Sequence, residues 1–128
     1  MCLDMLKRCL GMFKRVDGCY YGYKVFRVED GKLQSQYRDG YLERKSNRWL
    51  KSIQKRIYVG AEYTSGFHVL ARKKHTELYG SGFNYVVKRV KFRGVITTGT
   101  EMFNRWSNDL CVKVPVPVAV AKEMYICV

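Results

Sequence analysis

Basic side chains crowd the middle of the sequence and are the residues best suited to contact an acidic partner. Residues 44–93 contain 13 of the 24 lysines and arginines but only two acids, so this stretch carries +11 of the chain's net charge of +13. Three clusters hold these residues: Arg44, Lys45, Arg48, Lys51, Lys55 and Arg56; then Arg72, Lys73 and Lys74; then Lys88, Arg89, Lys91 and Arg93. Because dense charge of one sign repels itself, an acidic partner would stabilise this stretch.

The third cluster lies in the clearest strand pattern of the sequence, residues 84–98. Apolar side chains at Val86, Val90, Phe92 and Ile96 alternate there with basic ones at Arg89, Lys91 and Arg93. Like charges on one strand face repel each other, whereas a phosphate backbone binds such a face and releases its counterions. The sequence therefore predicts a surface that binds nucleic acid, or a protein with an acidic face.

Aromatic residues are interleaved with the basic clusters. They are Trp49, Tyr58, Tyr63, Phe67, Tyr79, Phe83, Tyr85 and Phe92. Such rings can stack on unpaired bases, and the hydrophobic core is the alternative location for each of them. No RNP-like strand, KH-type GxxG clamp or zinc-finger spacing accompanies them, so the nucleic-acid signal is electrostatic.

Candidate catalytic residues are sparse, and the sequence favours a protein that is not an enzyme. His68 falls in a predicted strand, which indicates a buried or hydrogen-bonded structural histidine, and His75 is expected to be exposed among lysines. The five cysteines have no CxxC spacing, which indicates free thiols in a reducing compartment. We expect no cofactor, no metal and no catalytic residue.

Local periodicity predicts the elements that hold the basic surface. Leu3, Leu6, Leu10 and Phe13 recur at helical spacing, which predicts an amphipathic helix over residues 1–16. This helix could pack on the domain or lie on a membrane surface, and Gly11 and the short apolar stripe favour packing.

Strand patterns fill most of the remaining sequence. A β-hairpin is expected over residues 20–38, with its turn at Glu29-Asp30-Gly31. Further strands are expected at 56–62, 66–70, 84–98 and 118–128, and short helices at 49–53, 71–79 and 100–106. Pro115 and Pro117 cannot donate to a strand ladder, so they are expected at an edge or in an extended link.

These elements predict a single α+β domain over residues 1–128. The N-terminal helix would occupy residues 1–16, and residues 20–128 would form a curved antiparallel sheet with one or two short helices. No apolar run approaches the roughly 20 residues that span a bilayer, and charges interrupt the N-terminal apolar stretch. We therefore expect a cytoplasmic protein without membrane contact, and its oligomeric state stays open.

Four segments bear a common pattern when they are read together: GYKVFRVEDGKLQS, GFHVLA, YVVKRVKFRGVI and, late in the chain, VAKEMYI. They resemble a group of small phage and prophage proteins with a YKxFR-type first strand, a G-[FW]-H motif, a V-x-V strand and a closing A-K-x-M strand. The resemblance implies a phage accessory protein that acts in the host cytoplasm on host machinery, including CRISPR–Cas defence. Its partner would then be nucleic acid or a host protein that binds nucleic acid.

The GFH strand and the helix predicted after it also resemble small ADP-ribosyltransferase folds. That resemblance implies, as the alternative function, NAD chemistry on a host target. Two departures count against it. The first strand carries Lys24 where those enzymes use a histidine or an arginine, and Glu123 is the only late acid in a predicted strand.

Overall fold

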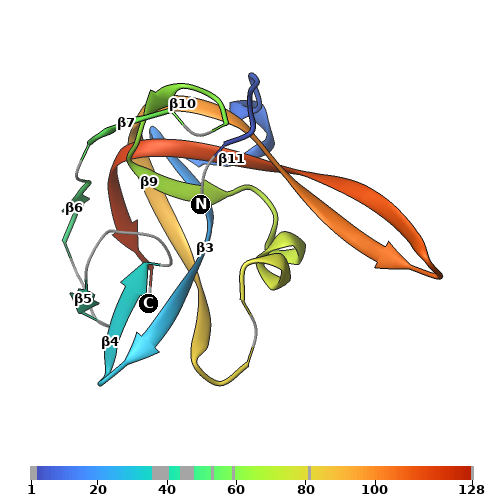
Figure 1. The fold of residues 1–128 in the computed structure, drawn as a ribbon. Helices are drawn as coiled ribbons and strands as arrows, with labels where there is room; N and C mark the ends of the chain where they lie inside the picture. The colour runs from blue at the N-terminus through green and yellow to red at the C-terminus, as the bar shows by residue number, and fades with distance from the viewer. Residues whose placement is uncertain are drawn as a thin grey trace.

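Two long antiparallel strands organise the molecule in the computed structural model, which describes residues 3–35, 41–43, 48–52, 54–58, 60–80 and 82–127. They are β10 (Tyr85–Ser107) and β11 (Leu110–Ile126). Asn108 and Asp109 join them, both with positive φ (48° and 62°), as a tight type I′ turn requires. Figure 1 shows this pair in orange and red, bent across the sheet and continuing beyond it.

The other strands pair with β10 and β11 or extend from their neighbours. β3 (Cys19–Glu29) pairs with β10, and β9 (Phe67–Leu70) pairs with β11. β3 and β9 meet at Tyr23 and Leu70, so the order β3–β10–β11–β9 closes into a small ring. The remaining members of this sheet are β1 (Met5–Leu6), β2 (Lys14–Val16), β4 (Lys32–Ser35), β5 (Tyr41–Glu43) and β6 (Leu50–Lys51). β7 (Arg56–Ile57) and β8 (Tyr63–Thr64) form a separate two-stranded sheet.

The hydrophobic core lies on both faces of β9 and of the adjoining part of β11. One cluster, which includes Phe26, Phe67 and Phe92, fills the ring, and a second, which includes Leu70 and Tyr79, covers the opposite face. Residues 67–70 and 116–121 are therefore buried without alternation. A strand that is covered on both faces has a continuous apolar sequence, as FHVL and VPVAVA do here.

The prediction of an α+β fold is wrong, because the structure is 63% strand and no helix within the described residues reaches seven residues. Two short 3₁₀ segments, η1 (Leu10–Met12) and η2 (Lys73–Leu78), are the only helical elements in the described part of the chain. The predicted N-terminal helix over 1–16 is also wrong. Met5 and Leu6 instead pair with Thr100 and Gly99 of β10, and this distant partner holds the segment extended.

The strand predictions held better than the helix predictions. The hairpin at 20–38, the strand at 66–70 and the strand at 84–98 correspond to β3–β4, β9 and the first part of β10. The predicted helix at 100–106 is wrong because β10 continues through it, and the segment at 49–53 contributes β6 rather than a helical turn. Only six residues of the predicted helix at 71–79 are helical, as η2, and β7 covers only the start of the predicted strand at 56–62.

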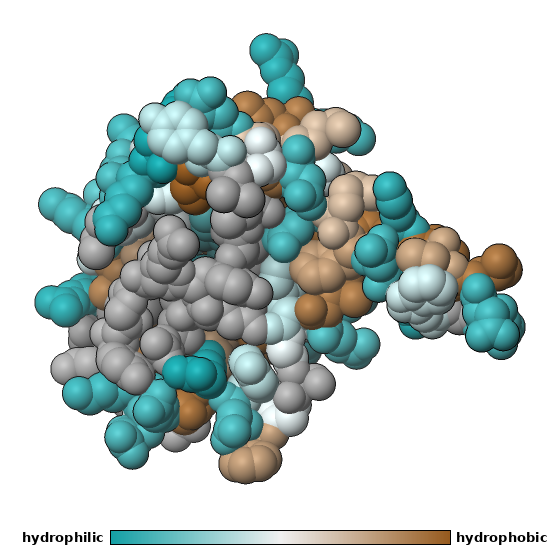
Figure 2. Space-filling view, in the orientation of Figure 1, coloured by the Kyte–Doolittle hydropathy of each residue, from teal (hydrophilic) through white to brown (hydrophobic). Residues whose placement is uncertain are grey.

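The far parts of β10 and β11, residues 101–115, leave the sheet as a two-stranded ribbon, the projecting ribbon. Figure 1 shows the projecting ribbon reaching away from the body, and Figure 2 shows hydrophobic side chains along it. Trp106, Leu110 and Val112 are exposed there. Pro115 lies in this ribbon, which agrees with its expected place at a sheet edge. The same expectation is wrong for Pro117, which is buried opposite Thr100 and accepts a hydrogen bond from the Ala71 N–H on its other side. No helix in the described residues has the length and apolar character to cross a membrane.

Candidate nucleic-acid interface

The alternating basic residues of β10 do project from one face of the sheet. Val90 and Phe92 are fully buried in the core inside the ring. The residues between them must point the other way, because successive side chains of a strand alternate. Arg89 and Arg93 are accordingly exposed and Lys91 is half-buried, which confirms the predicted face.

Strand pairing sets an aromatic ring on each side of this basic row. Lys91 lies opposite Tyr21 of β3 and opposite Tyr125 of β11. Residues opposite each other on paired strands share a face, so both tyrosines lie beside the lysine. Trp49 precedes β6 and contacts Tyr125 edge-on, with the ring centroids 5.8 Å apart.

Each basic side chain of the row lies over one or more of these rings. The guanidinium carbon of Arg93 is 3.9 Å from the Trp49 ring centroid, and that of Arg89 is 4.6 Å from the Tyr21 centroid. Lys91 Nζ is 4.4 Å from the Tyr125 centroid. These distances are within the range of cation–π attraction, which holds long basic side chains in place on an open surface.

The charge on this surface is strongly unbalanced. Lys14 of β2 lies opposite Tyr21, and Lys51 of β6 lies opposite Glu123 of β11, so both lysines share the face. Glu123 accepts a hydrogen bond from Arg93 Nε and is the one acid among the described residues of this surface. We call this surface the basic aromatic face: Lys14, Tyr21, Trp49, Lys51, Arg89, Lys91, Arg93, Glu123 and Tyr125. The described part of this face thus carries five basic side chains and one carboxylate.

The other predicted basic residues do not join this face. Lys88 lies opposite Lys24, on the core side of β10 and β3. Arg56 forms an ion pair with Glu62 in the small β7–β8 sheet, 3.1 Å between Nη2 and Oε1. Lys55 lies close to this small sheet rather than on the basic aromatic face, and its backbone N–H donates to Ser65 Oγ.

The remaining members of the first two clusters fall elsewhere. Arg48 is exposed, directly before Trp49, while Arg44 and Lys45 lie outside the described residues. Arg72, Lys73 and Lys74 are exposed at the start of η2, on a different part of the molecule. The predicted surface therefore divides, and four of its 13 basic residues meet on the basic aromatic face: Lys51, Arg89, Lys91 and Arg93.

Three residues of the face were not predicted from the sequence: Lys14, Tyr21 and Tyr125. The alternation of side chains within their strands is a usable signal, but only the pairing of β2 with β3, and of β3 and β11 with β10, shows that they meet. Among the predicted aromatic candidates, Phe67 and Phe92 are core residues. Trp49 is half-buried on the face, and Tyr58 and Phe83 are exposed elsewhere.

His68 is buried in a chain of hydrogen bonds, which confirms its predicted structural role. The Leu3 N–H donates to Tyr63 Oη, and the Tyr63 hydroxyl lies 2.8 Å from His68 Nε2. His68 Nδ1 is 3.1 Å from the Gly66 carbonyl, which can only accept, so Nδ1 carries the proton. Burial and the nearby Lys24 cation lower the pKa of His68 from 6.5 to about 3.

The residues singled out by the ADP-ribosyltransferase resemblance do not converge. Lys24 is buried, and its Nζ donates to the His68 carbonyl oxygen at 3.0 Å. Glu123 projects from the opposite, outer face, where it is paired with Arg93. The described residues hold no group of His, Cys, Asp and Glu side chains that could bind a metal ion.

Known proteins supply no template for this surface. No family model, curated protein or solved structure matches the chain. A function is therefore inferred from the chemistry of the basic aromatic face.

Proposed function

We propose that this protein binds single-stranded nucleic acid in the cytoplasm through the basic aromatic face. The observation that carries the proposal is the placement of three basic side chains over half-buried aromatic rings on one sheet face. Proteins that bind single strands combine these two features, because the cations contact phosphates and the rings stack on bases.

The exposure of each side chain indicates whether it would contact phosphates or bases. Arg89, Lys14 and Lys51 are exposed and are available to phosphate oxygens, whereas Arg93 is exposed but paired with Glu123. Trp49 and Tyr125 are half-buried, so their rings are fixed by the sheet and retain surface on which a base can stack. An unpaired base is the complementary group, because a base within a duplex has no free ring face.

The salt dependence of binding tests the electrostatic part. Each phosphate contact on a single strand contributes about 0.7 to the slope of log K against log salt. The variant Lys51→Gln/Arg89→Gln should therefore bind a fluorescent 5′-hydroxyl oligonucleotide more weakly, with a slope smaller by about 1.4. Its matched control is Arg105→Gln/Lys113→Gln, which removes two charges from the projecting ribbon and should leave the slope unchanged.

The two tryptophans provide a test of stacking. Trp49→Ala should weaken oligonucleotide binding by about 1–3 kcal/mol per stacked base, roughly 5- to 150-fold, with little change in slope. Trp106→Ala removes the same ring from the projecting ribbon and should have no effect.

Fluorescence anisotropy from low to high salt reads out both pairs of variants. Equal losses in the face and ribbon variants would show that only net charge matters. No binding at low salt, together with a stoichiometric complex with a host protein, would replace this proposal by the host-protein partner. The phage origin and the action on host defence stay predictions from the sequence pattern.

A further inference from the structure

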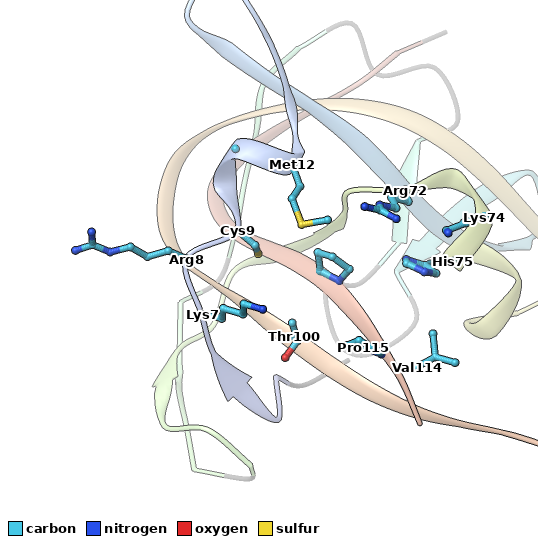
Figure 3. A pocket seen from close by; sticks show the side chains of 12 residues that line it. Lys7, Arg8, Cys9, Met12, Arg72, Lys74, His75, Thr100, Val114 and Pro115 are labelled. Carbon is cyan, nitrogen blue, oxygen red and sulfur yellow. The ribbon is translucent and has the colours of Figure 1, made fainter. Parts of the chain in front are cut away.

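A separate cavity of about 510 Å³ lies between the N-terminal segment, the start of η2 and strand β11. Figure 3 shows Lys7, Arg72 and His75 arranged around one space, with Met12 above it. These residues come from positions about 65 apart in the sequence, so only the fold brings them together. The cavity shares no residue with the basic aromatic face.

The polar lining of this cavity is basic. Lys7, Arg72 and Lys74 line it, and none of its lining residues is an acid. None of the three forms an ion pair with a carboxylate among the described residues. Arg8 also lines the cavity, but Figure 3 shows its guanidinium directed away from this space. Unpaired cations around one concavity raise its potential and attract an anion.

His75 supplies a second, independent observation. The sequence predicted an exposed side chain, but His75 is only 8% exposed, because η2 turns it toward the body of the protein. Its Nδ1 is buried and has no hydrogen-bond partner within the described structure. Most buried polar atoms are satisfied, so one that is not requires an explanation, and a bound polar ligand is such an explanation. Burial and the cations of Lys74 and Arg72 lower the pKa of this histidine, and an anion would oppose that effect.

One wall of the cavity is apolar. Met12 of η1 and Val114, Pro115 and Pro117 of β11 form this wall. The volume falls within the range of sites for small organic ligands and far exceeds the space that one inorganic anion needs. The ligand that fits both walls has an anionic group for the cations and a ring system for the apolar side.

We propose that this cavity binds a phosphate monoester attached to a nucleoside, either a free nucleotide or the 5′-phosphate end of a strand. The phosphate oxygens accept hydrogen bonds from Lys7, Arg72 and Lys74, and the His75 ring borders them. The nucleoside lies against Met12 and the prolines. This site goes beyond the proposed function, because it needs no residue of the basic aromatic face.

Isothermal titration calorimetry with AMP, adenosine and inorganic phosphate tests the site. AMP should bind, phosphate should bind more weakly, and adenosine should not bind. Charge-assisted hydrogen bonds are the strong ones, so Lys7→Gln/Arg72→Gln should weaken AMP binding by about tenfold or more. Both side chains are exposed, so the variant should fold, which circular dichroism checks. Arg105→Gln/Lys113→Gln is the control of equal charge and should bind AMP normally.

Two further measurements separate this site from the basic aromatic face. Lys7→Gln/Arg72→Gln should bind a 5′-hydroxyl oligonucleotide normally, whereas Lys51→Gln/Arg89→Gln should bind AMP normally. The affinities of AMP and of a 5′-phosphorylated dinucleotide are then compared. Tighter binding of the dinucleotide identifies a strand end as the ligand, and tighter binding of AMP identifies a free nucleotide. Absence of saturable AMP binding in the millimolar range, or equal binding of adenosine and AMP, would overturn the proposal.

Discussion

Acidification should destabilise this protein through His68. The unfolded chain binds a proton at His68 with a pKa near 6.5, whereas the folded chain does so only at about 3. Folding therefore favours the neutral imidazole, and the associated stability is fully present above pH 6.5 and is lost as the pH falls toward 3. The cause is burial first and the Lys24 cation second.

The magnitude follows from the two pKa values. Each unit of difference corresponds to about 1.36 kcal/mol, so the full effect is at most about 5 kcal/mol. Between pH 6.5 and pH 5 the loss is about 2 kcal/mol, a large part of the stability of a typical small domain. Protonation would also place a donor at Nε2, where the Tyr63 hydroxyl now donates.

Urea unfolding at pH 7, 6 and 5 measures this loss, and His68→Gln provides the comparison. The variant should be less stable at pH 7 but should lose about 2 kcal/mol less between pH 7 and pH 5. Other titrating groups contribute equally to both proteins, so the difference isolates His68. The same pH dependence in the variant and the natural sequence would refute the proposed origin of the effect.

Three further outcomes check the packing. Gly22→Ala should destabilise the fold by about 1–3 kcal/mol in urea unfolding, because a Cβ there would lie 2.6 Å from a backbone oxygen of β9. Gly11→Ala is the control, since open space surrounds that position, and it should be neutral or slightly stabilising. Phe92→Ala should cost about 3–5 kcal/mol, whereas Trp106→Ala should stay within about 0.5 kcal/mol, since the first ring is buried and the second is 72% exposed. Lys24→Met should raise the pKa of the buried histidine, followed by NMR, yet leave it below 6.5, because burial is the larger cause.

Local patterns predicted the parts of the fold that depend on neighbouring residues. The Asp30-Gly31 turn has positive φ at both residues, and the alternation of β10 places Arg89, Lys91 and Arg93 on one face. The turn and the alternation each depend on residues close together in the sequence, so local patterns predict them directly.

The failures come from pairings between distant segments. The apolar spacing at the N-terminus fits a helix, yet Leu6 is 47% exposed while Leu3 is buried against the core. Backbone pairing with residues 99 and 100 outweighs the local preference, and no local pattern contains that information. The aromatic partners of Lys91 were missed for the same reason, because they lie on strands about 70 and 34 residues away.

The pairing order has a consequence for synthesis on the ribosome. β1, β3 and β9 all have strand partners in β10 or β11, which lie in the last third of the sequence. Among the described residues, the earlier segments pair with each other only in the meander of β2 to β5, in the β7–β8 pair and at the one contact of β3 with β9, and the apolar face of that meander remains open. The β10–β11 hairpin, in contrast, closes through its own two-residue turn. Its emergence should therefore trigger folding of the whole chain, and nascent chains that stop before it should bind chaperones or aggregate.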